Sequence, residues 1–125
     1  MKIALIGTGN LGLSIAKGLV INNTYTTLYL TKRNLDSIES WTQYKNVFVT
    51  SDNKEAVKNA DILILAVQPS QLDSVLTELK PLLGARHILI STVTGYPISR
   101  IEAFVGEKIS IVRSMPNTAI SVRKS

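Results

Sequence analysis

The chain opens with Lys2-Ile-Ala-Leu-Ile-Gly-Thr-Gly-Asn-Leu-Gly12, in which a short apolar run leads directly into a Gly-x-Gly-x-x-Gly turn. The run predicts a buried strand, and the residues after it predict a helix. In such a unit Gly7 adopts turn dihedrals, Gly9 lets a pyrophosphate approach the backbone, and Gly12 lets the helix pack closely on the strand. The start of the helix offers unpaired N–H groups to phosphates. We therefore predict a dinucleotide-binding turn, with a glycine-rich turn of no special purpose as the alternative.

Downstream, strand-like stretches alternate with stretches of helical periodicity. Leu11, Ile15 and Leu19 recur on one helix face, and Asn22-Asn23 is expected to end that helix. Further strands are predicted at residues 26–31, 47–50, 62–67, 87–91 and 109–112, and helices at 34–44, 52–60, 72–79 and 98–104. Residues 62–67 are apolar at every position, which is typical of a parallel strand covered on both faces. The pattern predicts a Rossmann-like α/β fold, a doubly wound and mainly parallel sheet with helices on both faces.

The composition is that of a single domain with a substantial core. The chain has 125 residues, of which 45% are hydrophobic, and no stretch approaches the roughly 18 apolar residues of a membrane span. There are no cysteines, so disulfides and thiolate metal sites are excluded. We recognise no targeting segment, and we expect a cytoplasmic protein with no membrane partner.

The positive charge of the chain is dispersed. The formal net charge is +5, and the 14 Lys and Arg residues form no run longer than Lys32-Arg33 or Arg123-Lys124. Aromatic residues are few and are not interleaved with the basic ones, so we expect no nucleic-acid partner. A dispersed basic surface is also compatible with an anionic small ligand.

The end of the second predicted strand carries Lys32 and Arg33, about 20 residues beyond the glycine turn, where a ribose-reading residue is expected. An NAD site usually has Asp or Glu there, because a carboxylate accepts a hydrogen bond from the ribose 2′-hydroxyl. A carboxylate would repel a 2′-phosphate, whereas two cations attract it. The pair therefore favours NADP over NAD, with a solvated basic loop as the alternative. Asp36, the nearest carboxylate, is predicted to lie within the following helix.

Other strand ends offer small side chains and free backbone groups, at residues 66–69, 92–94 and 113–118. Ligands of doubly wound sheets bind beyond these carboxyl ends. His87 begins a predicted strand at the opposite, amino end, so we assign it a structural role. No cluster has metal-ligand spacing, and no catalytic acid is evident.

Several of these stretches together resemble one family. They are Ile6-Gly-Thr-Gly-Asn-Leu-Gly12, Asn53-Lys-Glu, Leu65-Ala-Val-Gln-Pro69, His87-Ile-Leu-Ile-Ser91 with Gly95, and Arg113-Ser-Met-Pro-Asn-Thr118. With them the chain resembles the pyrroline-5-carboxylate reductases over essentially all of its residues. The Arg-x-Met-Pro-Asn-Thr pattern is the most specific. The family usually has Lys in place of Gln68 and small residues in place of Val93 and Thr94.

The resemblance implies that NADPH, or less often NADH, gives a hydride to the imine carbon of 1-pyrroline-5-carboxylate and so produces L-proline. The glycine turn would hold the pyrophosphate, Lys32 and Arg33 the ribose or its 2′-phosphate, and Asn53 the adenosine half. The remaining residues would line the path to the nicotinamide. The implied cofactor-binding residues are Gly7, Thr8, Gly9, Asn10, Leu11, Gly12, Lys32, Arg33, Asn53, Ala66, Val67, Gln68, Pro69, Thr92, Val93, Thr94 and Asn117.

The resemblance also implies a second domain. Family members continue into a helical domain that forms a homo-oligomer and supplies most of the pocket for the cyclic imino acid substrate. We expect residues 1–125 to be the cofactor-binding domain alone, a fragment or truncated frame with little or no turnover. Alternatives are another NADP-dependent imine or deazaflavin-linked reductase, and a non-catalytic dinucleotide-binding module.

Overall fold

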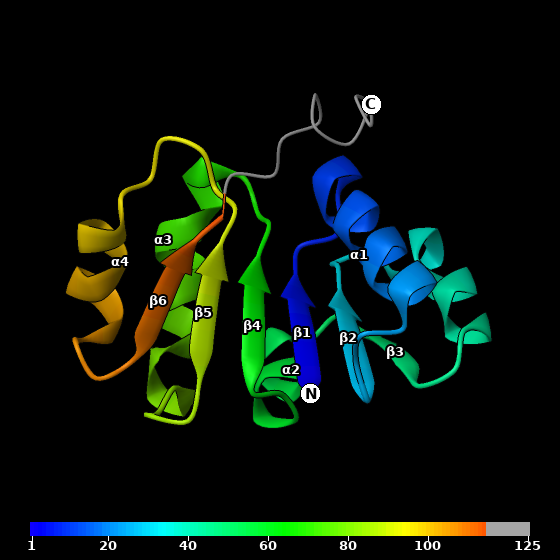
Figure 1. The fold of residues 1–125 in the computed structure, drawn as a ribbon. Helices are drawn as coiled ribbons and strands as arrows, with labels where there is room; N and C mark the ends of the chain where they lie inside the picture. Colours follow the sequence, from blue (N-terminus) through cyan, green and yellow to red (C-terminus); the bar gives the residue numbers. More distant parts are fainter. Residues whose placement is uncertain (115–125) are drawn as a thin grey trace, which may run out of the picture.

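The computed structural model describes residues 1–114, which form a six-stranded parallel sheet in the order β3-β2-β1-β4-β5-β6 (Figure 1). The strands are β1 (Lys2–Ile6), β2 (Thr27–Thr31), β3 (Val47–Thr50), β4 (Ile62–Leu65), β5 (Ile88–Ser91) and β6 (Ser110–Arg113). The helices are α1 (Asn10–Asn22), α2 (Asn53–Lys58), α3 (Pro69–Leu79) and α4 (Ile98–Val105), with 3₁₀ helices η1 (Leu35–Ser37), η2 (Glu39–Gln43) and η3 (Lys80–Leu82). The predicted fold class is confirmed.

The strand order places a topological switch point between β1 and β4. From β1 the chain moves outward to β2 and β3, and it then returns to β4 on the other side of β1. The connections that follow β1 and β4 therefore run in opposite directions along the sheet, which leaves a crevice beyond their carboxyl ends. The glycine turn lies at this crevice because it directly follows β1.

Two apolar layers hold the helices to the sheet. On one face, α2, α3 and α4 contribute Val57, Leu72, Leu76 and Ile101, all fully buried, to a core cluster that includes Leu63 of β4. On the other face, Ala16 of α1 packs with buried residues of β1 and β2. Leu63 and Leu65 of β4 are buried on one face and Ile64 on the other, while Ile62 is half-buried, so the uninterrupted apolar run correctly indicated a strand with buried residues on both faces.

Helices cover the α1 face of the sheet unevenly. In Figure 1, α1 lies in front of the half of the sheet with β1, β2 and β3, whereas no described helix lies in front of β4, β5 and β6. Ile88 of β5 is 38% exposed and Val112 of β6 is 49% exposed. Both alternate with residues of the opposite, covered face, such as Leu89, which is fully buried.

The helix predicted at residues 34–44 is wrong: this segment forms the short 3₁₀ helices η1 and η2. The Asn34 side chain accepts a hydrogen bond from the Asp36 N–H, and the Ser37 and Thr42 hydroxyls donate to the carbonyls of Asn34 and Glu39. Such local side-chain bonds compete with α-helical hydrogen bonding. The polar side chains of this segment therefore stabilise tight turns in place of the predicted helix.

The start of α2 is capped by Asp52, whose carboxylate accepts a hydrogen bond from the Lys54 N–H. The spacing of Asp52 and Glu55 in the sequence also predicts a capping box. Its reciprocal half does not form, because the Glu55 carboxylate accepts a hydrogen bond from the Thr50 hydroxyl at 2.7 Å. This bond ties the end of β3 to α2. No helix within residues 1–114 is long and apolar enough to span a bilayer.

Candidate functional site

The three glycines of the turn have three different surroundings. Gly7 has a φ of +92°, and an added Cβ would lie 2.8 Å from the Val67 side chain. At Gly12 an added Cβ would lie 2.2 Å from the Gly7 carbonyl oxygen, so α1 can approach the turn only without a side chain there. At Gly9 an added Cβ would meet nothing within 4 Å. Gly7 and Gly12 thus shape the turn, while Gly9 faces open space that a ligand can enter.

Helix α1 begins beside this space with unpaired donors. The first backbone bond of the helix runs from the Leu13 N–H to the Gly9 carbonyl, and the N–H groups of residues 10–12 find no partner within residues 1–114. No acidic residue lies in the first turn, and no side chain caps it. Within residues 1–114 nothing competes for these donors, and such a helix start is the kind of position that accepts an anion.

Thr31, the last residue of β2, holds the glycine turn in place. Its side-chain oxygen accepts a hydrogen bond from the Gly7 N–H at 3.2 Å, and the Thr8 hydroxyl donates to its backbone carbonyl at 2.9 Å. Thr31 is only 2% exposed. These bonds fix the turn relative to the end of β2, and so relative to Lys32 and Arg33.

A cavity of about 370 Å³ lies beyond the carboxyl ends of β1, β2 and β4. It lies at the switch point of the sheet, where doubly wound folds bind their ligands. The cavity is lined by Gly7, Thr8, Gly9, Thr31, Lys32, Arg33, Ser51, Asn53, Ala66, Val67, Gln68, Gln71, Ser74 and Val75. Segments far apart in the sequence, and predicted separately as strand ends, therefore meet at one site.

The charge of the cavity wall is positive. Lys32 and Arg33 are its only charged lining residues in the described part of the chain, and no carboxylate lines it. Asp36 does not line the cavity; it lies in η1, where its N–H donates to the Asn34 side chain. The Asn53 amide donates to the Glu78 carboxylate of α3 at 3.2 Å. The electrostatics favour an anionic ligand over a ribose with free hydroxyls.

Some predicted residues lie near the cavity without lining it. Asn10, Leu11 and Gly12 form the first turn of α1, and Pro69 begins α3. Thr92 and Val93 are buried, and the Thr92 hydroxyl donates to the Leu65 carbonyl at 2.7 Å; Thr94 is exposed just beyond β5. Asn117 and most of the Arg113–Thr118 motif lie outside the described residues.

Sequence reasoning missed several lining residues. Ser51 follows β3, and Gln71, Ser74 and Val75 lie on one face of α3. Their spacing of three and four residues marks a single helix face. The sequence carried this signal, but it did not indicate which side of α3 would turn toward the cavity.

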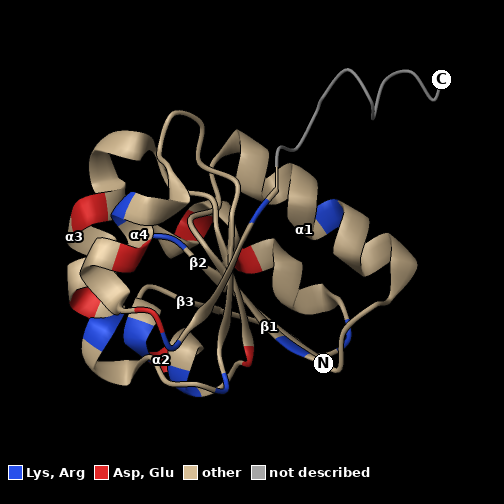
Figure 2. Cartoon of the chain, turned by 60° about the vertical axis from the view of Figure 1, so that its left-hand side comes forward, with Lys and Arg blue, Asp and Glu red and all other residues tan. Residues whose placement is uncertain are grey.

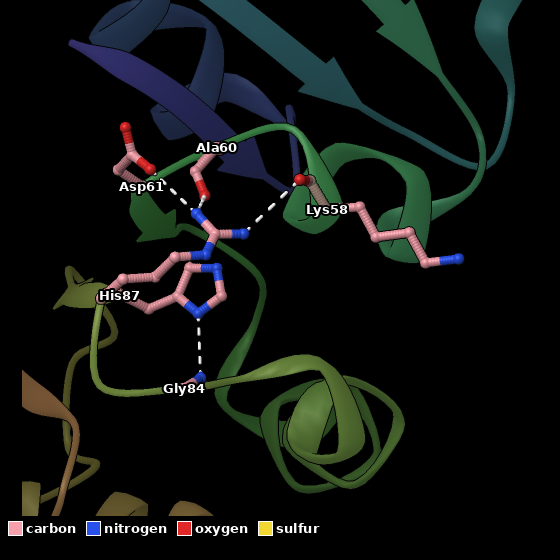
Figure 3. A network of polar contacts seen from close by, with 6 residues as sticks. Lys58, Ala60, Asp61, Gly84 and His87 are labelled. Carbon is pink, nitrogen blue, oxygen red and sulfur yellow. Dashed lines mark hydrogen bonds and ion pairs between the residues drawn. The ribbon is translucent and has the colours of Figure 1, made fainter.

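His87 directly precedes the amino end of β5, at the opposite end of the sheet from the cavity. Figure 3 shows its ring with the dashed contact to Gly84. It is 1% exposed, and its Nδ1 accepts a hydrogen bond from the Gly84 N–H at 3.0 Å. The neighbouring Arg86 donates to the Asp61 carboxylate and to the Ala60 carbonyl, both at 2.8 Å. Burial and the Arg86 charge lower the pKa of His87, while the Val57 and Ala60 carbonyls and Asp61 act in the opposite direction.

Basic residues of the described chain occur on many separate elements. Figure 2 shows Lys and Arg on helices, loops and strand ends around the domain, interspersed with acidic residues on the side of α2, α3 and α4. Within residues 1–114, no three side chains that could ligate a metal gather together.

Comparison with known proteins identifies close relatives of this domain. Residues 2–95 match the family model described as NADP oxidoreductase coenzyme F420-dependent. The chain is 41% identical over 128 residues to pyrroline-5-carboxylate reductase 2 of Dictyostelium discoideum, covering 99% of this chain and 43% of that protein.

Solved structures of pyrroline-5-carboxylate reductases also resemble this chain. A pyrroline-5-carboxylate reductase from Coxiella burnetii superposes with a TM-score of 0.87 at 37% identity, over 98% of this chain and 46% of that one. A Plasmodium falciparum pyrroline carboxylate reductase with NADP bound superposes with a TM-score of 0.82 at 30% identity, over 98% of this chain and 44% of that one. The chain thus spans less than half the length of these relatives. It belongs to the family described as NADP oxidoreductase coenzyme F420-dependent, and its resemblance to pyrroline-5-carboxylate reductases is confirmed.

Proposed function

We propose that this chain binds NADP(H) in the switch-point cavity and serves as the cofactor domain of a pyrroline-5-carboxylate reductase. The observation that carries the proposal is a phosphate-accepting glycine turn in the same cavity as Lys32 and Arg33, with no carboxylate in the described lining. The relatives named above support the reaction, the reduction of 1-pyrroline-5-carboxylate to L-proline. NAD(H) is the less favoured cofactor, because nothing in that lining replaces the usual ribose-binding carboxylate.

The described residues fit a dinucleotide phosphate by shape and by charge. Gly9 leaves open the space that a Cβ would fill, and the N–H groups of Asn10 and Leu11 at the start of α1 have no partner among the described residues. We assign the pyrophosphate to this position. Lys32 and Arg33 would then hold the 2′-phosphate, and Asn53, which lines the same cavity, would lie by the adenosine half.

NADPH would supply the hydride, and the residues of this chain would bind and orient the cofactor. The described cavity lining contains no His, Asp or Glu that could transfer a proton to a substrate. We therefore propose that the substrate pocket and the homo-oligomer contacts belong to parts of the parent enzyme beyond this cofactor domain. The cytoplasmic location also remains a prediction from the sequence.

A second reductase function has specific support. The matching family model is described as coenzyme F420-dependent, so a deazaflavin or another imine could exchange hydride with NADP(H) on this domain. The pyrroline-5-carboxylate reductase assignment is favoured because full-chain similarity to such enzymes reaches 41% identity over 99% of the chain. A non-catalytic dinucleotide-binding module is the remaining alternative.

A chimera tests the proposed function. Residues 1–125 replace the matching segment of the Dictyostelium discoideum reductase, and NADPH oxidation is followed with 1-pyrroline-5-carboxylate, a different cyclic imine, or oxidised coenzyme F420. We expect the chimera to reduce 1-pyrroline-5-carboxylate and the isolated chain to show negligible turnover. A chimera that binds NADPH but reduces only F420, or nothing, contradicts the assignment, and the NADPH titration separates that outcome from misfolding.

A further inference from the structure

Asp73, Tyr96 and Arg100 form a polar cluster that joins α3 to the connection between β5 and α4. The Tyr96 hydroxyl donates a hydrogen bond to the Asp73 carboxylate, and Arg100 donates to the other oxygen of that carboxylate at 2.8 Å. The Arg100 guanidinium also lies 4.7 Å from the centroid of the Tyr96 ring. The three side chains therefore contact one another in pairs. None of them lines the cavity.

Tyr96 is almost fully buried, although it lies in the connection between β5 and α4. Its ring is 2% exposed and packs in the core cluster beneath α3 and α4. The pKa of Tyr96 is raised to about 12, first by burial and then by the bond to Asp73. The bond to Tyr96, followed by Arg100, lowers the pKa of Asp73. A neutral phenol therefore donates to a charged carboxylate at any ordinary pH.

The short segment before Tyr96 is fixed at both ends and exposed between them. At its start, the N–H and hydroxyl of Thr92 both donate to the Leu65 carbonyl, at 3.0 and 2.7 Å. At its end, Tyr96 connects it to α3. Between them, Thr94 and Gly95 are exposed, and Gly95 has a φ of +75°. Two anchors thus hold an exposed stretch of backbone in a conformation that only glycine adopts easily.

This exposed backbone leaves β5 at the same edge of the sheet as the cavity. A dinucleotide bound across the switch point, with its 2′-phosphate at Lys32 and Arg33, must extend its other half along the carboxyl ends of β4 and β5. We propose that Tyr96 is a positioning residue, whose hydroxyl holds the Thr94–Gly95 backbone in place for the nicotinamide half of the cofactor. This role rests on the proposed function.

The hydroxyl is not needed to hold α3 itself. Leu72, Leu76 and Leu79 of that helix are fully buried, and Asp73 keeps Arg100 as a partner when the hydroxyl is removed. The segment between β5 and α4 has only Val93 and Tyr96 in the core. Removing the hydroxyl should therefore loosen the segment and leave the α3 side of the cavity unchanged.

The test compares a whole dinucleotide with its adenosine half. Calorimetry measures the affinity of the 125-residue chain for NADP⁺ and for adenosine 2′,5′-bisphosphate, in wild type and in Tyr96→Phe. The matched control is Tyr25→Phe, which removes an exposed hydroxyl bonded to the Lys45 carbonyl at 3.2 Å, away from the cavity. Amide hydrogen exchange at residues 94–96 is measured on the same proteins without ligand.

We expect Tyr96→Phe to weaken NADP⁺ binding roughly 3- to 10-fold, the effect of about one hydrogen bond. Binding of adenosine 2′,5′-bisphosphate should stay within about 1.5-fold, a difference too small to represent a lost contact. Amide hydrogen exchange at residues 94–96 should become faster in Tyr96→Phe. Tyr25→Phe should change neither the two affinities nor the exchange at these residues.

Equal weakening of both ligands, or unchanged NADP⁺ affinity, overturns the positioning role. If wild type binds neither ligand, the proposed function fails and this inference fails with it. If wild type binds both and only the Tyr96 result is negative, the proposed function stands and this inference alone is lost.

Discussion

Gly9 and Gly12 lie three residues apart in one turn, yet the surrounding atoms leave room for an added side chain at Gly9 and none at Gly12. A Cβ at Gly12 would lie 2.2 Å from the Gly7 carbonyl oxygen, while a Cβ at Gly9 would meet nothing within 4 Å. Gly9 also has a φ of −72°, which any residue can adopt. Gly12 is therefore structural, and we assign Gly9 to the ligand.

Gly12→Ala should lower the free energy of unfolding by about 1–3 kcal/mol, because the helix must move away from the turn. Gly9→Ala should lower it by less than about 1 kcal/mol, yet it should weaken NADP⁺ binding roughly tenfold or more, since the methyl group occupies the space assigned to the pyrophosphate. Urea denaturation and calorimetry measure the two effects. Unchanged cofactor affinity in Gly9→Ala would contradict the assignment of that space.

His87 gives a pH dependence that is separate from cofactor binding. Its folded-state pKa lies below the ordinary value of 6.5, so the unfolded chain binds more protons as the pH falls through that value. The stabilising contribution of neutral His87 is present above pH 6.5 and is lost progressively below it. The charged groups beside it, Arg86 and Asp61, are paired with each other.

His87→Asn should remove this dependence, because the Asn side chain can still accept the Gly84 N–H but does not titrate. We expect the wild-type free energy of unfolding to decrease from about pH 7 to about pH 5 and that of the variant to change less over the same interval. Asp73 does not contribute to the pH dependence in this interval, because its pKa is lowered from the ordinary value of 3.8. Parallel pH profiles for the two proteins would show that His87 has no such role.

Strand β5 shows the unequal burial of the two sheet faces within adjacent residues. Leu89 is fully buried beneath α3 and α4, whereas Ile88 is 38% exposed on the part of the α1 face without a described helix. Leu89→Ala should cost about 2–5 kcal/mol of stability by leaving a cavity. Ile88→Ala should cost well under half as much, because its side chain is already partly hydrated. Similar losses in urea denaturation would mean that both faces are covered in solution.

The strands were predictable from short runs rich in apolar, β-branched or aromatic residues, and the continuous run at residues 62–67 correctly indicated a parallel strand. The segment 34–44 was not predictable in the same way. Its Asn, Ser and Thr side chains form hydrogen bonds with nearby backbone groups. Such bonds leave no periodic pattern of apolar residues in the sequence from which the turns could be predicted. The capping box predicted at Asp52 does not form for a related reason, since the Glu55 carboxylate accepts a hydrogen bond from the Thr50 hydroxyl.

At the scale of the whole molecule, the site is a product of strand order. Lys32, Asn53 and Gln68 are far apart in the sequence, and they share a cavity because β2, β3 and β4 end at one edge of a parallel sheet. That rule made the strand-end residues predictable. It could not predict Gln71 and Ser74, because the rotation of α3 about its axis depends on how its buried leucines pack.

We propose that Lys32 and Arg33 make this cavity selective for a 2′-phosphate. Calorimetry with NADP⁺ and NAD⁺ tests it on wild type and on the double charge reversal Lys32→Glu with Arg33→Glu. The control is Lys17→Glu with Lys45→Glu, which changes the net charge equally at positions outside the cavity.

We predict that wild type and control bind NADP⁺ at least about tenfold more tightly than NAD⁺, a difference of roughly 1.4 kcal/mol. The Lys32/Arg33 variant should lose this preference while its NAD⁺ affinity changes by less than about threefold. Equal affinity of the wild type for NADP⁺ and NAD⁺ would show that Lys32 and Arg33 do not select for a 2′-phosphate.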